Sequence, residues 1–328
     1  MSAEGVVGRD RELAAVVAFL DGLPSGPCGL LLEGEAGIGK TTVWRAGATW
    51  AAGRSYTVLS CRPAQPETAL SFSGLGDLLD SVLDRVLPLL PSPQRRALEV
   101  ALLMKDPGSS PPEQRAVSVA FLAAIRHLSA SAPVVLAIDD LQWLDVPSAA
   151  TAEFALQRLG HEPVGLLASL RDRGVERPAS LARAGLPAER LTRLRIGPLA
   201  FGAFQSMVRA TVGSGFSRLT IRRLFDASGG NPFYGLELAR ALHHADGEPS
   251  PEEPLPVPAD LQGLLSARLA ALPDDTQDAL LAAACLILAT ILIFAAGKPV
   301  CSTAFSGSSN SRPGTMSKLR PACRGQSI

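Results

Sequence analysis

One short segment, residues 34–41, constrains the fold of this chain more than any other. It reads Gly-Glu-Ala-Gly-Ile-Gly-Lys-Thr, which has the spacing G-x-x-x-x-G-K-[ST], and it directly follows the apolar run 29–33. Glycines let the backbone turn with its N–H groups facing inward, so that a polyphosphate can be wrapped without obstruction by side chains. The segment therefore predicts a strand, a phosphate-binding loop and a helix, in that order. A glycine-rich turn that binds nothing is the alternative.

Two residues at the end of this loop have predicted roles. Lys40 is a point charge for the β and γ phosphates, and it is the first predicted catalytic residue. Thr41 offers a hydroxyl to Mg²⁺, and the helix that begins near Lys40 directs its positive end toward the anion. The loop residues predicted to bind nucleotide are Gly34, Glu35, Ala36, Gly37, Ile38, Gly39, Lys40, Thr41 and Thr42.

The charge balance and the cysteines narrow the class of protein. The chain has 328 residues, of which 31 are basic and 31 acidic, so no footprint for nucleic acid or a membrane surface is expected. Five cysteines without a C-x-x-C pair argue against a zinc site or a disulfide framework. The amino terminus lacks the pattern of a secretory signal. These features predict a cytoplasmic protein with reduced thiols and no DNA-binding module in this chain.

Periodicity along the chain predicts an α/β fold, a doubly wound parallel sheet. Strand-like runs alternate with helical patterns up to Gly197, and alternation of this kind is typical of such sheets. The runs are 28–33, 56–60, 133–139, 164–169 and 190–196. Prolines break the segment that precedes the helical pattern 114–128, and no element is assigned there. After Pro198 only helical spacing is found, over 200–211, 217–228 and 232–244.

Two carboxylates follow the apolar run 134–138. Asp139 is predicted to hold Mg²⁺, because the carboxyl end of a parallel strand near the phosphate loop is where such folds bind the metal. Asp140 is a candidate to orient a water for attack on the γ-phosphate. Its alternative is a capping or surface acid. Arg171 ends the next strand, where a guanidinium can reach a γ-phosphate, although a surface arginine is the bland alternative.

Four motifs taken together resemble a known family. They are Val6–Glu12, Gly34–Thr41, Ile138–Trp143 and Gly230–Phe233, in that order. This set resembles the ATPase module of large ATP-binding LuxR-type bacterial transcriptional regulators, which are signal-transducing ATPases with numerous domains (STAND) and relatives of the AAA+ group. The likeness covers about residues 5–285.

The resemblance implies further roles. Val7 and Arg9 would lie near the adenine, Arg171 would act as a sensor, and Pro232 would touch the base from a helical lid. Taken by itself, the Gly-Gly-Asn-Pro segment that contains Pro232 reads as a helix stop followed by the first residue of the next helix. Such modules act as switches, in which ADP keeps lid and core closed, and exchange for ATP with an inducer opens them for self-association.

The carboxy-terminal part departs from the family. Relatives of this kind continue into helical repeats and a helix-turn-helix, whereas residues 279–328 contain no Asp or Glu and three of the five cysteines. We interpret this as a truncated or frame-shifted gene product. Residues 279–296, in which only Thr290 is polar, are just long enough to span a membrane. Their high alanine content favours a core helix instead, so we do not expect this segment to associate with a membrane.

The expected organisation has five parts. They are a P-loop ATPase core (1–197), a helical lid (198–245), a linker (246–258), a partial winged-helix-like module (259–286) and an atypical tail, disordered or frame-shifted (287–328). The expected activity is ATP binding with slow hydrolysis in a regulatory role, with Lys40, Asp140 and Arg171 as catalytic residues and Thr41 and Asp139 as metal ligands. A small-molecule kinase and a protein that holds ADP without turnover are the alternatives.

Overall fold

The computed structural model describes residues 6–107, 113–171, 186, 188–213, 215–244, 273 and 275–284. The chain divides into two compact units, residues 1–257 and 258–328. In the second unit the described residues include a helix over 275–284. The predicted linker (246–258), the tail (287–328) and most of the predicted winged-helix-like module lie outside the described residues.

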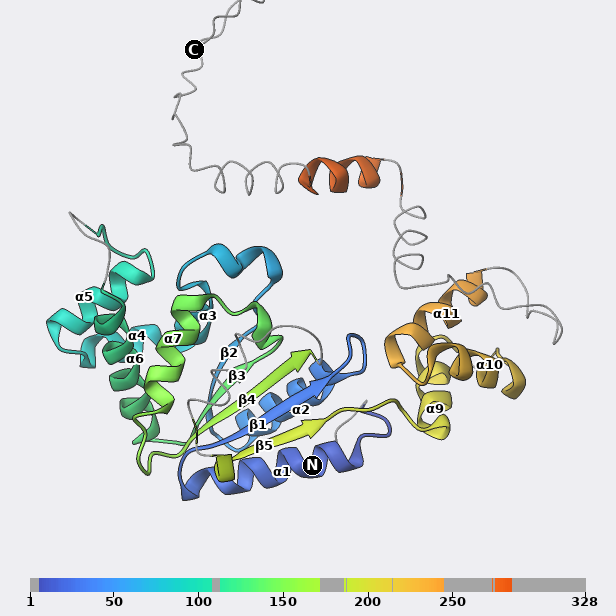
Figure 1. Ribbon diagram of the computed structural model, residues 1–328, viewed down its shortest axis with the longest axis horizontal. Coiled ribbons are helices and arrows are strands. Elements are labelled where there is room, and N and C mark those ends of the chain that lie inside the picture. Colours follow the sequence, from blue (N-terminus) through green and yellow to red (C-terminus); the bar gives the residue numbers. More distant parts are fainter. Residues whose placement is uncertain are drawn as a thin grey trace, which may run out of the picture. The chain divides into compact units, whose positions relative to one another are not determined.

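The first unit is built around a five-stranded parallel sheet (Figure 1). Its strands follow the order β2-β3-β4-β1-β5, and every neighbouring pair is parallel. The strands are β1 (Cys28–Gly34), β2 (Thr57–Cys61), β3 (Val134–Ile138), β4 (Val164–Arg171) and β5 (Leu191–Arg195). This sheet confirms the predicted fold class. Because the strands are parallel, the carboxyl ends of β1, β3 and β4 meet at one edge.

Helices cover both faces of the sheet. Leu30 and Leu32 of β1 pack into a core with α1 (Asp10–Gly22) and α2 (Lys40–Gly53), whereas Leu31 faces a separate core on the other side. That second core includes buried residues of α6 (Gln114–Ser129) and α7 (Val146–Leu156). Strands buried on both faces explain the continuous apolar runs in the sequence. Short 3-10 turns cover Leu23–Ser25, Gln65–Ala69, Asp80–Val82, Leu87–Leu89, Leu141–Trp143 and Ala188–Arg190.

Three helices lie in the proline-containing segment to which the sequence assigned no element. They are α3 (Ser73–Leu79), α4 (Leu83–Val86) and α5 (Ser92–Ala101). Proline is compatible with the first turn of a helix, where no backbone N–H is needed, and α5 has a proline there.

Asp145 joins this segment to α7. Its buried carboxylate accepts hydrogen bonds from the N–H of Ser148 at 2.9 Å, as the N-cap of α7, and from the N–H groups of Phe72 at 2.9 Å and Gly74 at 3.0 Å. One side chain therefore satisfies amides at the start of two helices.

The carboxy-terminal part of the first unit is helical. Its elements are α9 (Phe201–Thr211), α10 (Arg218–Ser228) and α11 (Pro232–His244), which lie where the spacing predicts helices. The ring of Phe225 contacts those of Phe201 and Phe204 edge to face, at centroid distances of 5.5 and 5.4 Å. In Figure 1 these helices are coloured yellow to orange. We use "lid" for α9–α11.

Within the described part of the chain, no helix combines the length and the apolar character that crossing a membrane requires. Residues 285–296 of the candidate span lie outside the described residues.

Candidate functional site

The phosphate loop joins β1 to α2 as the sequence predicts. Gly37 and Gly39 adopt positive φ angles of 75° and 103°, which L side chains rarely tolerate. Lys40 begins α2, is only 6% exposed, and donates hydrogen bonds from Nζ to the carbonyl oxygens of Gly34 at 3.0 Å and Glu35 at 2.8 Å. Backbone carbonyl groups of the loop thus fix the side chain of Lys40 at the amino end of α2, where the helix dipole favours an anion.

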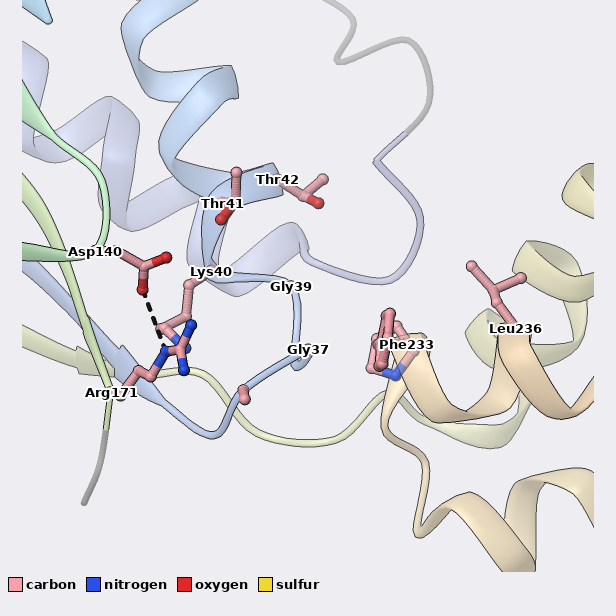
Figure 2. Close-up of a pocket in the computed structure, with 11 residues that line it drawn as sticks. Gly37, Gly39, Lys40, Thr41, Thr42, Asp140, Arg171, Phe233 and Leu236 are labelled. Carbon is pink, nitrogen blue, oxygen red and sulfur yellow. Dashed lines mark ion pairs between the residues drawn. The ribbon is translucent and has the colours of Figure 1, made fainter. Parts of the chain in front are cut away.

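A cavity of about 310 Å³ opens above this loop (Figure 2). It is lined from one side by the loop and the strand ends and from the other by α11. The lining residues are Ala36, Gly37, Gly39, Lys40, Thr41, Thr42, Asp140, Arg171, Pro232, Phe233 and Leu236. Most of the residues predicted for the site therefore meet around one space.

Asp139 precedes the cavity-lining Asp140 and is 2% exposed. Its Oδ1 accepts hydrogen bonds from the hydroxyls of Ser169 at 2.6 Å and Thr41 at 3.3 Å, and its Oδ2 lies 3.5 Å from Nε of Arg62. The sheet explains these contacts, since Asp139 directly follows β3 and the adjacent strand β4 carries Ser169.

The donor set around Asp139 suits a magnesium ion. A buried carboxylate and the hydroxyl of Thr41 approach each other at 3.3 Å, and hard divalent cations prefer such oxygen ligands. Burial of an isolated carboxylate is unfavourable, so a cation at this position would offset its charge. The residues predicted to hold Mg²⁺ are thus in contact.

Asp140, one residue further on, lies in a different environment. Its backbone is left-handed, with φ 51° and ψ 52°, and its N–H donates to the hydroxyl of Ser169 at 2.8 Å. Its Oδ1 accepts a hydrogen bond from Gln142 at 2.6 Å and forms an ion pair with Nε of Arg171 at 3.5 Å, drawn as the dashed line in Figure 2. Two predicted catalytic residues are therefore paired with each other across the cavity edge.

Arg9 links three segments near the loop. Its buried guanidinium donates to the carbonyl oxygens of Ile38 at 2.6 Å and Gly197 at 2.8 Å, and to Glu12 at 2.9 Å. Arg9 thus connects the phosphate loop to the segment that leads into the lid. Neither Arg9 nor Val7 is among the described residues that line the cavity, so their proximity to an adenine stays a prediction.

The lid contacts the phosphate loop directly. The side-chain amide of Asn231 donates to the carbonyl oxygen of Ala36 at 3.1 Å. The N–H of Phe233 donates to the carbonyl oxygen of Gly37 at 3.3 Å and to Oδ1 of Asn231 at 3.1 Å. A Cβ atom on Gly37 would approach Cβ of Phe233 to 2.5 Å. Figure 2 shows Phe233 facing this part of the loop, so Gly37 is needed for the close approach as well as for its φ angle.

Several residues of the site were not selected from the sequence. Asn231 and Phe233 belong to a recognised motif, but the helix stop and the following proline accounted for that motif locally. Ser169 is a polar residue near the end of a strand, and its contact with Asp139 depends on the pairing of β3 with β4. Arg62 belongs to none of the motifs, and Gln142 lies within the motif Ile138–Trp143 without a predicted role of its own, because the contacts of both depend on neighbouring strands and turns. Pro232 does line the cavity, as the resemblance implies.

The strand order, the G-K-T loop after β1 and the buried aspartate after β3 define a P-loop nucleotide-binding fold. The model of the AAA ATPase domain family matches residues 5–168, and the chain belongs to this family. Family membership supports nucleotide binding as its general class of activity.

Solved structures show low sequence identity to this chain. A STAND protein with a tetratricopeptide repeat sensor from Pyrococcus horikoshii is 16% identical (TM-score 0.46), over 83% of this chain and 33% of that one. The ORC1 protein of Aeropyrum pernix, in complex with DNA, is 15% identical (TM-score 0.45), over 84% and 71%. DnaA from Aquifex aeolicus, bound to AMPPCP, is 14% identical (TM-score 0.41), over 74% and 64%. This chain thus spans about a third of the STAND protein. Comparison with curated proteins gave no match.

Proposed function

We propose that this chain binds ATP with Mg²⁺ and hydrolyses it slowly, as the switch module of a LuxR-type transcriptional regulator. The observation that carries the proposal is that Lys40 and Thr41 line a cavity that residues of α11 also line, while Thr41 contacts the buried Asp139 at the same edge of the sheet. The order of the four sequence motifs supports the narrower assignment to the LuxR type.

Each side chain of the core has a definite task in this proposal. Lys40 and the amino end of α2 supply positive charge to the β and γ phosphates. Thr41 and Asp139 would hold Mg²⁺, which when bound neutralises phosphate oxygens. The backbone of residues 34–39 encloses the phosphate chain, and Thr42 lines the cavity next to it. The rest of the cavity, between Pro232 and Leu236 of α11 and the loop, accommodates the less charged part of a nucleotide.

The environment of Asp140 supports slow turnover. A general base must have its carboxylate within reach of the attacking water, yet Oδ1 of Asp140 is engaged by Gln142 and by Arg171. Hydrolysis then requires Arg171 to leave Asp140 and turn toward the γ-phosphate. The same ion pair favours one alternative, a protein that retains ADP without turnover.

The lid contacts support a switch. Because Asn231 and Phe233 bond to carbonyl groups of the phosphate loop, the position of the lid and the conformation of the loop are coupled. A nucleotide that alters the loop changes the free-energy difference between lid positions, which is how a ligand shifts a two-state equilibrium. Self-association in the ATP state is part of this proposal.

The test begins with the nucleotide that co-purifies with the protein. Lys40→Ala is expected to lose it, because removing one charged phosphate contact costs about 1.5–3 kcal/mol, or about ten- to a hundred-fold in affinity. Asp140→Asn is expected to keep ATP binding and lose phosphate release. Lys105→Ala, which removes an exposed lysine paired with Glu99, serves as the control.

The outcomes separate the candidates. Absence of any affinity for ADP or ATP in the presence of Mg²⁺ would refute the proposal. Tight ADP binding without phosphate release, in both the native protein and Asp140→Asn, would establish the ADP-holding alternative. Rapid transfer to an added small acceptor would instead identify a kinase.

A further inference from the structure

Arg62 is a third cation at the site, in addition to Lys40 and Arg171. It directly follows β2, the edge strand next to β3, and its Nε lies 3.5 Å from Oδ2 of Asp139. The two side chains differ greatly in exposure, at 59% for Arg62 and 3% for Asp139. A mobile, solvated guanidinium thus lies beside the buried carboxylate that is proposed to hold the metal.

A guanidinium and a divalent cation are competitors at this carboxylate. Oδ1 of Asp139 already accepts two hydroxyl hydrogen bonds, from Ser169 and Thr41, and Oδ2 is the atom that faces Arg62. At 3.5 Å the Arg62 contact is longer than an ordinary N–H···O hydrogen bond, so it is mainly electrostatic. A second positive charge placed on the same group would repel Arg62.

A second cavity offers Arg62 another position. This cavity measures about 290 Å³ and is lined by Ser60, Cys61, Arg62, Asp77, Asp80 and Ser81. Of these described residues, Arg62 carries the only positive charge, against two carboxylates. Burial, followed by the negative charges of Glu67 and Asp80, raises the pKa of Asp77, and a nearby cation would offset these charges. Arg62 therefore lies between Asp139 and a second acidic group.

We propose that Arg62 is a positioning residue that neutralises Asp139 when no metal is bound, and that it moves to Asp77 and Asp80 when Mg²⁺ arrives with a nucleotide. The inference rests on the proposed function, because it concerns the metal of that same site. Arg62 touches neither nucleotide nor metal in this role. Instead it sets how strongly the metal contributes to nucleotide binding.

The readout is the dissociation constant of mant-ADP in EDTA divided by its dissociation constant in Mg²⁺. A larger ratio means that the metal contributes more to nucleotide binding. ADP has no γ-phosphate, so contacts of Arg62 with that group do not enter. Arg62→Gln removes the competitor, and the ratio is expected to rise about two- to five-fold, the range of a solvent-exposed ion pair. Arg62→Lys keeps the charge and should stay near the native ratio.

The acidic group is tested in the opposite direction. Asp77→Asn combined with Asp80→Asn removes the alternative position, so Arg62 stays on Asp139 and the ratio should fall about two- to five-fold. In the Arg62→Gln background the same pair of changes should have no effect, since the cation through which they act is gone. Arg126→Gln, a half-exposed arginine paired with Glu162, is the matched control.

The outcomes distinguish this inference from the proposed function. If the native protein does not bind mant-ADP at all, the proposed function fails. If it binds, but Arg62→Gln leaves the ratio unchanged or lowers it, the competition is refuted while nucleotide binding stands. If the Asp77 and Asp80 changes have equal effects with and without Arg62, these acids act on the metal directly and the second position of Arg62 is refuted.

Discussion

The two walls of the cavity are built in contrasting ways. The wall at the sheet edge includes the buried Lys40, held by two backbone carbonyl groups, and Thr41, which contacts Asp139, itself held by two hydroxyls. The wall at the lid touches the loop through the amide of Asn231 and the N–H of Phe233. Groups buried in the sheet edge cannot move without loss of core packing, whereas the lid contacts can be broken individually. From this contrast we infer that the sheet edge is a fixed binding surface and that the lid is able to move away from it.

The largest effect is expected for the fixed wall. Asp139→Asn removes the charge that would hold Mg²⁺, and it should weaken mant-ATP binding in Mg²⁺ by tens-fold because a charged ligand contact is lost. Binding in EDTA should change little. Titrations of the variant in both buffers test this, with Asp84→Asn on the exposed side of α4 as the control. Equal weakening in EDTA and Mg²⁺ would show that Asp139 has only a structural role.

A smaller effect is expected at the lid. Asn231→Ala removes the bond to Ala36 and the acceptor for the N–H of Phe233, each worth about 1 kcal/mol, so opening of α11 should become about five- to thirty-fold more frequent. Hydrogen exchange should rise over 232–244 and stay unchanged in β3. Asn231→Asp retains the acceptor and should lie in between. Faster exchange in β3 as well would contradict the separation of the two walls.

The smallest effect concerns the pH dependence of the core. Burial, opposed in part by Arg190, raises the pKa of Cys28 at the start of β1 from 9.0 to about 11. Between these values the folded state holds a proton that the unfolded chain loses, so stability falls as pH rises from about 9 to about 11.

Melting temperatures check this expectation. Cys28→Ala should show a shallower decline in melting temperature over that pH range than the native protein, because the titrating thiol is gone. Other groups that titrate there are common to both proteins. Parallel curves would show that the thiol does not contribute to the pH dependence of stability. A pH effect confined to the lid would contradict the contrast between the two walls of the cavity.

The sequence predicted the sheet because its strands carry uninterrupted apolar runs, and it predicted the loop because the glycines at 34, 37 and 39 precede Lys40 and Thr41 in the spacing of a phosphate-binding loop. The helices between residues 73 and 101 were not predicted from the sequence. Prolines in this segment favour interruptions, although Pro93 lies in the first turn of α5, where proline is compatible with a helix.

The side-chain partners of the site could be predicted only in part. Thr41 and Asp139 lie in contact because each belongs to a motif with a fixed place in the fold, and their role as ligands of Mg²⁺ stays a prediction. Arg62 and Ser169 became partners of Asp139 through the pairing of β2 and β4 with β3, which a single sequence does not reveal. The ion pair between Asp140 and Arg171 likewise depends on a left-handed backbone and on the end of the adjacent strand, so it could not be predicted, and the role of Asp140 in orienting a water stays a prediction.

Asp145 has a mechanical consequence. The hydrogen bonds of its carboxylate join the beginning of α3 to the beginning of α7, only a few residues beyond the acids that follow β3. A displacement of the segment 73–101 would be transmitted through these hydrogen bonds to the turn that contains Asp139 and Asp140. A molecule that binds to those helices would thereby act on the turn that contains Asp139 and Asp140 without entering the cavity.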